Sequence, residues 1–256
     1  MPRTVLVTGS TSGIGLGIAK AFAQQGHTIV FNGLEKDGAA IAAGVADKYR
    51  IPHLFSPANM MDAGEVRALV EEAENVFGGV DILVPNAGIQ YVSPVEAFPA
   101  EKWDAILAIN LPSAFHLAKA AWPGMKARGW GRIICIASAH GLVASEYKSA
   151  YVAAKHGLIG LTKVLALEGA PHGITANAVC PGYVRTPIVE AQIGDQMTAH
   201  RLTREEVIQK VMLEKQAIKS FNTIESIAAA VMYLASDAAG TTTGIALPVD
   251  GGWTAQ

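Results

Sequence analysis

Short apolar runs rich in Val and Ile alternate along the chain with longer segments whose apolar residues recur every three or four positions. The first pattern predicts buried strands, and the second predicts amphipathic helices. Strands are predicted at residues 5–7, 28–32, 52–56, 80–84, 132–137, 174–180 and 246–249. Helices are predicted at residues 16–25, 37–48, 62–77, 103–127, 149–169 and 224–235. This alternation predicts an α/β fold, a doubly wound Rossmann domain with a seven-stranded, mostly parallel sheet.

No linker or internal repeat interrupts this pattern, so residues 1–256 are expected to form one domain. Residues 188–221 are more polar and irregular, with helical pieces such as 204–216, and we interpret them as a mobile helical lid. Half of the residues are hydrophobic, which is enough for a sizeable core. The net charge of −2 comes from scattered residues, which argues against a nucleic-acid surface or a polybasic membrane patch.

Cysteine usage and the lack of targeting signals indicate a cytoplasmic protein. Cys135 and Cys180 lie in apolar predicted strands. We therefore interpret them as buried free thiols, which are typical of a reducing compartment. No apolar stretch is long enough to cross a bilayer, and the first predicted strand begins too early to leave room for a cleavable signal. No His, Cys or carboxylate cluster has the spacing of metal ligands, so no metal is expected.

A glycine-rich turn, Thr8-Gly9-Ser10-Thr11-Ser12-Gly13-Ile14-Gly15, joins the first predicted strand to the first predicted helix. Gly9 permits a tight turn, while Gly13 and Gly15 let backbone N–H groups and the helix N-terminus approach a pyrophosphate. The spacing differs from the G-x-G-x-x-G usual in dinucleotide-binding folds, so a tight structural turn is the alternative.

The residues that end the second predicted strand bear on the choice of cofactor. They read Phe31-Asn32-Gly33-Leu34, without a carboxylate for the ribose hydroxyls and without an Arg for a 2′-phosphate. Ser12 in the turn is not basic, and Lys36, the one cation close by, is better explained as a solvated loop charge. The sequence therefore favours NAD over NADP.

Ser138, Tyr151 and Lys155 are the candidate catalytic residues. Tyr151 and Lys155 are four positions apart in a predicted helix, so they share one face. An ammonium beside a phenol favours the phenolate and lowers the tyrosine pKa from about 10. Ser138 follows the predicted strand 132–137 and is placed to hydrogen-bond the same reacting oxygen.

Three further segments carry polar residues near predicted strand ends or helix breaks. Asn86-Ala87-Gly88 follows the fourth predicted strand, at the edge where open α/β sheets bind ligands. Asn110 precedes a helix break before Pro112, where a freed carbonyl would help to hold a water; a simple helix cap explains it equally well. Gln90, taken alone, is an ordinary loop residue.

The chain resembles the short-chain dehydrogenase/reductase family over essentially its whole length. The matching motifs, in order, are Thr8-Gly9-x-x-x-Gly13-x-Gly15, Asn86-Ala87-Gly88, Asn110, Ser138, Tyr151-x-x-x-Lys155 and Pro181-Gly182. The resemblance implies a nicotinamide cofactor, a homotetramer and a proton relay through Asn110, Ser138, Tyr151 and Lys155. The implied cofactor-binding residues are Gly9, Thr11, Ser12, Gly13, Ile14, Gly15, Asn59, Asn86, Ala87, Gly88, Tyr151, Lys155, Pro181, Gly182 and Val184.

Within that family, the stretches 86–90, 138–151, 184–192 and 249–255 are most similar to the 3-hydroxybutyrate dehydrogenases. This resemblance implies NAD-dependent interconversion of (R)-3-hydroxybutyrate and acetoacetate, with Tyr151 as general acid and base. Lys148 lies about one helical turn before Tyr151, near a helix N-terminus, which suits an anion; without the resemblance it would be a solvated lysine. The implied substrate-binding residues are Gln90, Ser138, His140, Lys148, Tyr151, Tyr183, Gln192 and Trp253, of which Gln90, His140, Lys148 and Gln192 hold the carboxylate.

Three residues depart from the family pattern: Pro85, Asn59 and Tyr183. Tyr183 stands where the hydroxybutyrate dehydrogenases have Trp, so it leaves more room and adds a hydroxyl, and chain-length selectivity stays open.

Two other functions also stay open. One is another short-chain reductase, acting on a 3-oxoacyl carrier or a sugar, and the other is a cofactor-binding regulator without catalysis. The intact Ser138, Tyr151 and Lys155 argue against the regulator.

Overall fold

The computed structural model describes residues 1–186, 189–190, 193–194, 197 and 201–255. In these residues, seven strands form one sheet in the order β3-β2-β1-β4-β5-β6-β7. All of its pairings are parallel, and the strand order reverses between β1 and β4. The strands are β1 (Thr4–Val7), β2 (Thr28–Asn32), β3 (His53–Ser56), β4 (Ile82–Val84), β5 (Gly131–Ile136), β6 (Ile174–Pro181) and β7 (Ala246–Val249). The predicted doubly wound α/β fold is confirmed.

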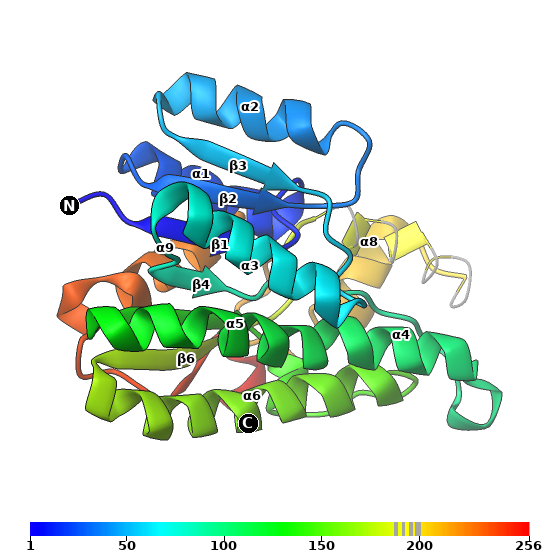
Figure 1. The fold of residues 1–256 in the computed structure, drawn as a ribbon. Coiled ribbons are helices and arrows are strands. Elements are labelled where there is room, and N and C mark those ends of the chain that lie inside the picture. Colours follow the sequence, from blue (N-terminus) through cyan, green and yellow to red (C-terminus); the bar gives the residue numbers. More distant parts are fainter. Residues whose placement is uncertain (187–188, 191–192, 195–196, 198–200, 256) are drawn as a thin grey trace.

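Helices cover both faces of the sheet (Figure 1). One face carries α3 (Ala63–Phe77), α5 (Pro112–Arg128) and α6 (Ser149–Gly169). The other carries α1 (Gly13–Gln24), α2 (Gly38–Tyr49) and α9 (Ile224–Ala235). No helix within the described ranges is both long and apolar enough to cross a membrane.

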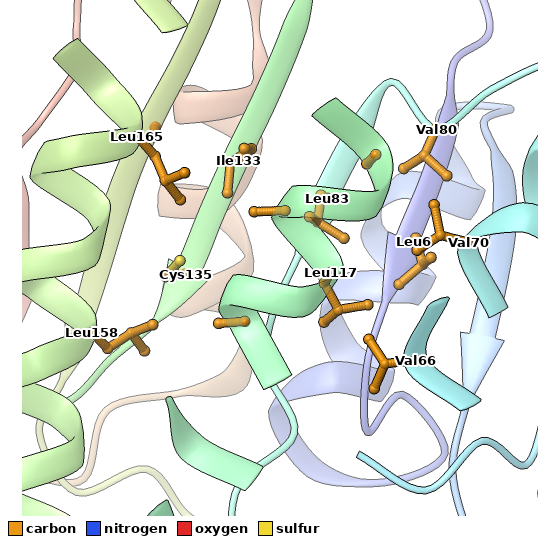
Figure 2. Close-up of a cluster of buried hydrophobic side chains, with 14 of the residues drawn as sticks. Leu6, Val66, Val70, Val80, Leu83, Leu117, Ile133, Cys135, Leu158 and Leu165 are labelled. Atoms are coloured by element: carbon orange, nitrogen blue, oxygen red, sulfur yellow. The ribbon is translucent and has the colours of Figure 1, made fainter. Parts of the chain in front are cut away.

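The two faces of the sheet are apolar because consecutive strand residues point to opposite sides. Leu6 of β1 packs with Val66, Leu83 and Leu117 in one core (Figure 2). Its neighbours Val5 and Val7 pack on the other side, against α1 and α9. A parallel sheet covered on both faces needs apolar residues at every position, which explains the continuous runs in the sequence.

Local signals set most helix boundaries. Asp62 caps α3 by accepting hydrogen bonds from the backbone N–H groups of Gly64 and Glu65 at 2.7 and 3.1 Å. The predicted helix 103–127 forms two helices, α4 (Ala100–Asn110) and α5, divided at Leu111 before Pro112. α1 begins three residues before its predicted start, because the glycine-rich turn leads directly into its first turn.

Of the predicted lid, residues 188–221, the structure describes residues 189–190, 193–194, 197 and 201–221. The helix predicted at 204–216 is shorter: α8 (Arg204–Val207) continues as a π-helical turn, Ile208–Met212. Val189, Ile193, Val207 and Met212 form a small separate core that packs against Tyr183 and Phe221. This segment therefore has its own packing, and its motion stays a prediction.

Candidate active site

A pocket of about 690 Å³ opens where the strands end. Because the strands are parallel, the loops that follow β1, β2, β4, β5 and β6 meet at this edge. Thr11 lies behind the pocket wall, and Gln192 lies outside the described residues. The predicted residues that line the pocket are Gly9, Ser12, Gly13, Ile14, Gly15, Asn59, Asn86, Ala87, Gly88, Gln90, Asn110, Ser138, His140, Lys148, Tyr151, Lys155, Pro181, Gly182, Tyr183, Val184 and Trp253.

The glycine-rich turn fits a phosphate group. Gly9 and Gly13 have φ angles of 59° and 51°, which residues with a Cβ rarely adopt. Ser12 occupies the N-cap of α1 but makes no side-chain cap bond, and its hydroxyl lies 3.4 Å from Glu35 Oε1 instead. The first backbone N–H groups of α1 are therefore not satisfied by the usual cap, as at helix ends that bind anions.

Two asparagine side chains hold this turn in place. Asn86 Nδ2 donates to the carbonyl oxygens of Thr8 and Gly9 at 2.8 and 3.2 Å. Asn32 Oδ1 accepts from Gly9 N at 3.2 Å, while its Nδ2 donates to two carbonyls in the 56–58 segment after β3. Asn86 thus shapes the end of the pocket formed by the glycine-rich turn, and the buried Asn32 contributes to the same end.

Glu35 lines the same end of the pocket, and the sequence reasoning missed it. Its carboxylate accepts hydrogen bonds from the hydroxyls of Thr11 and Ser12. The Thr11 bond, more than any other contact, lowers the pKa of Glu35, so the group is an anion at neutral pH. A carboxylate was expected only within residues 31–34, although Glu35 lies 20 positions after Gly15, the spacing typical of a ribose-binding carboxylate.

Asn110 ends α4 with its side chain facing the pocket. Its Nδ2 donates to the carbonyl oxygens of Ile106 and Ile89 at 2.8 and 3.0 Å. Its Oδ1 is buried and has no hydrogen-bond partner among the described residues. A Cβ on Gly88 would lie 2.6 Å from this oxygen, so glycine leaves the space in front of it open. The arrangement fits a water or another donor at Oδ1.

Ser138, Tyr151 and Lys155 meet at the centre of the pocket. Lys155 Nζ donates to the carbonyl oxygen of Ile136 at 2.8 Å and lies 5.5 Å from the centre of the Tyr151 ring. Burial raises the pKa of Tyr151 to about 12, although the Ser138 hydroxyl opposes this rise. Burial also lowers the pKa of Lys155 to about 8. The expected lowering of the Tyr151 pKa by Lys155 is therefore wrong for the protein alone, because desolvation of the phenol prevails.

The other end of the pocket combines a cation with aromatic rings. Lys148 is 9% exposed, and its Nζ lies 3.5 Å from the Tyr183 hydroxyl. The Tyr183 ring stacks on Trp253 with centroids 5.5 Å apart. Gln90 Nε2 is buried without a hydrogen-bond partner in the part of the chain that the structure describes. A buried ammonium and an unsatisfied amide donor that line one pocket suit a carboxylate.

His140 lies between these two regions. Its backbone N–H donates to Ser138 Oγ at 3.1 Å, its Nε2 lies 2.9 Å from Ser145 Oγ, and its ring meets Trp253 edge-on at 5.0 Å. Burial, followed by the charge of Lys148, lowers the pKa of His140 to about 3. The imidazole is therefore uncharged at neutral pH, so any contact with a carboxylate would be a hydrogen bond and not an ion pair.

The two cysteines near the sheet edge are not reactive thiolates. Cys135 and Cys180 are buried, and burial raises the pKa of each thiol to about 11, so neither is a thiolate at neutral pH. Among the described residues, no group of His, Cys, Asp and Glu is arranged to hold a metal ion.

The charge state of His140 is testable. We expect its imidazole resonances, assigned by comparison with His140→Gln, to show no titration between pH 8 and about pH 5, because the folded-state pKa is about 3. The unfolded chain takes up this proton near pH 6.5. Stability should therefore fall as pH drops below about 6.5, and less so in His140→Gln. A midpoint near 6.5 in the folded protein would contradict this.

Comparison with known proteins shows the family to which the chain belongs. A family model described as Enoyl-(Acyl carrier protein) reductase matches residues 9–254. The chain is 51% identical to the D-beta-hydroxybutyrate dehydrogenase of Rhizobium meliloti over the whole of both chains, and 51% identical to that of Cupriavidus necator over 99% of this chain and 98% of the relative. It is 36% identical to a 3-oxoacyl-[acyl-carrier-protein] reductase of Haemophilus influenzae over 98% of this chain and 97% of the relative. The chain belongs to the short-chain dehydrogenase/reductase family of oxidoreductases.

Proposed function

We propose that the protein interconverts (R)-3-hydroxybutyrate and acetoacetate with NAD as cofactor. The observation that carries the proposal is that Tyr151 and Ser138 line the same pocket as the buried Lys148 and as Gln90, whose Nε2 is buried. A small 3-hydroxy acid has a hydroxyl that matches Tyr151 and Ser138 and a carboxylate that matches Lys148 and Gln90. The names of the relatives from Rhizobium meliloti and Cupriavidus necator support the same substrate.

The residues of the pocket supply the proton chemistry. Tyr151 takes the proton of the substrate hydroxyl, and in the reverse direction it returns a proton to the carbonyl oxygen. Ser138 hydrogen-bonds the same oxygen, and Asn110 holds through its Oδ1 a water that carries protons towards solvent. A nicotinamide held in this pocket would supply the hydride chemistry at C3, and its oxidised form would bring a positive charge into the pocket that Tyr151 lines. That charge opposes the burial that keeps the pKa of Tyr151 near 12 in the protein alone.

Lys148 and Gln90 position the substrate by its carboxylate, and the paired rings of Tyr183 and Trp253 close that end of the pocket. Carboxylate binding at one end and hydroxyl contacts at the other fix which face of C3 is turned to the cofactor. This two-point contact supports selectivity for one enantiomer.

Glu35 supports NAD as the cofactor. Its carboxylate lies against the glycine-rich turn, where it is able to accept hydrogen bonds from ribose hydroxyls. A 2′-phosphate at the same place would bring two anions close together, and their repulsion would disfavour NADP.

The substrate is tested by following NADH formation with (R)- and (S)-3-hydroxybutyrate. We expect turnover of the (R) acid and at least about 100-fold slower turnover of the (S) acid. Lys148→Met should raise KM for the acid by about tenfold or more, because it removes the ammonium that holds the carboxylate. The neutral amide of the same acid, as the matched control, should be unaffected by that substitution. No turnover of the (R) acid by the wild-type protein would refute the proposed reaction.

Cofactor selectivity is tested separately with Glu35→Gln, which removes the charge and keeps the side-chain length. We expect kcat/KM with NADP to rise about tenfold, which corresponds to about 1.4 kcal/mol of removed repulsion. Asp37→Asn removes an exposed carboxylate from the same loop and serves as the control. If both variants changed the NAD-to-NADP ratio equally, a local role for Glu35 would be excluded.

A further inference from the structure

Gln216 is a buried polar residue in an otherwise exposed turn. Its side chain is 1% exposed, whereas Glu214, Lys215 and residues 217–220 are all exposed. Burying an amide is unfavourable unless its donors and acceptor find partners. This position therefore requires a polar side chain with specific hydrogen-bond partners.

The amide of Gln216 forms hydrogen bonds through both its nitrogen and its oxygen. Its Nε2 uses both hydrogens, donating to the carbonyl oxygens of Ser220 and Ile218 at 2.9 and 3.2 Å. Its Oε1 accepts from the backbone N–H of Tyr183 at 3.4 Å. One amide group thus closes its own turn and ties that turn to the segment that carries Tyr183.

The same turn also supports the segment before Trp253. Ile218 N donates to the carbonyl oxygen of Gly251 at 2.8 Å. Gly251 has a φ of +65°, and a Cβ there would come within 2.8 Å of Gln216 Nε2. Only glycine allows this close approach, two residues before Trp253.

We propose that Gln216 is a positioning residue for the substrate. It does not line the pocket, but its side chain bonds the backbone of Tyr183, and the turn that it closes bonds Gly251 through Ile218 N. These two segments carry the rings of Tyr183 and Trp253, which stack 5.5 Å apart. The Tyr183 hydroxyl in turn lies 3.5 Å from Lys148 Nζ, so the placement of the ring also places the ammonium. The inference rests on the proposed function only for the identity of the bound acid.

The test compares Gln216→Met with Gln209→Met. Both replace a glutamine with an apolar side chain of similar length, but Gln209 is exposed on the neighbouring π-helical turn. We expect Gln216→Met to raise KM for (R)-3-hydroxybutyrate about tenfold, while KM for NAD changes less than about twofold. Gln209→Met should leave both constants unchanged.

A second readout needs no turnover. The indole ¹H–¹⁵N resonance of Trp253, assigned with Trp253→Phe, should shift in Gln216→Met and not in Gln209→Met. If Gln216→Met does not fold, Gln216→Asn, which keeps the amide but shortens it, is examined by the same two measurements.

The inference is overturned if the Trp253 resonance does not shift in Gln216→Met. This holds both if KM for the acid is unchanged and if KM for the acid and KM for NAD rise together. If the resonance shifts but the wild-type protein does not oxidise the acid, the proposed function fails and the positioning role of Gln216 stands.

Discussion

The hydrogen bond from Lys155 Nζ to the carbonyl oxygen of Ile136 joins α6 to the last residue of β5, and the site depends on it. Both groups are buried, and burial lowers the pKa of the Lys155 ammonium to about 8, so the carbonyl oxygen is an important partner for it. The bond fixes the register of α6 against the sheet. Since Tyr151 lies one turn before Lys155 and Ser138 lies two residues after Ile136, it also sets the distance between the two proposed catalytic hydroxyls.

Buried or half-buried amides play the same part elsewhere at the sheet edge. Asn86 and Asn32 hold the glycine-rich turn, Asn110 joins α4 to the segment after β4, and Gln216 joins the turn before α9 to Tyr183. An amide side chain is suited to holding loops because it both donates and accepts hydrogen bonds and carries no charge that must be neutralised. The loops are thus held by polar side chains, while the helices and strands are held by the two apolar cores.

The fold was predictable from the sequence because a parallel sheet buried on both faces requires continuous apolar runs such as Val5 to Val7. Tyr151 and Lys155 were predictable because their spacing places them on one helix face. Glu35 could have been found from its spacing after Gly15, but its hydrogen bonds to Thr11 and Ser12, more than 20 positions away in the chain, are visible only in the structure.

Two other features depend on burial, which the sequence does not show directly. The rise in the pKa of Tyr151 and the neutral state of His140 both follow from desolvation in the folded chain. Gln216 looks ordinary in a polar segment, and only the structure shows that it is 1% exposed.

The central claim is that Tyr151 transfers the proton while other residues bind the cofactor and the acid. The most direct measurement is the kcat of Tyr151→Phe together with its affinity for NAD, determined by calorimetry. We predict that kcat falls by about 10³-fold or more, because general acid–base catalysis alone is worth about 10²- to 10⁴-fold, while the Kd for NAD changes less than about threefold. A variant that retained kcat within about tenfold of the wild type, with NAD bound normally, would contradict the account.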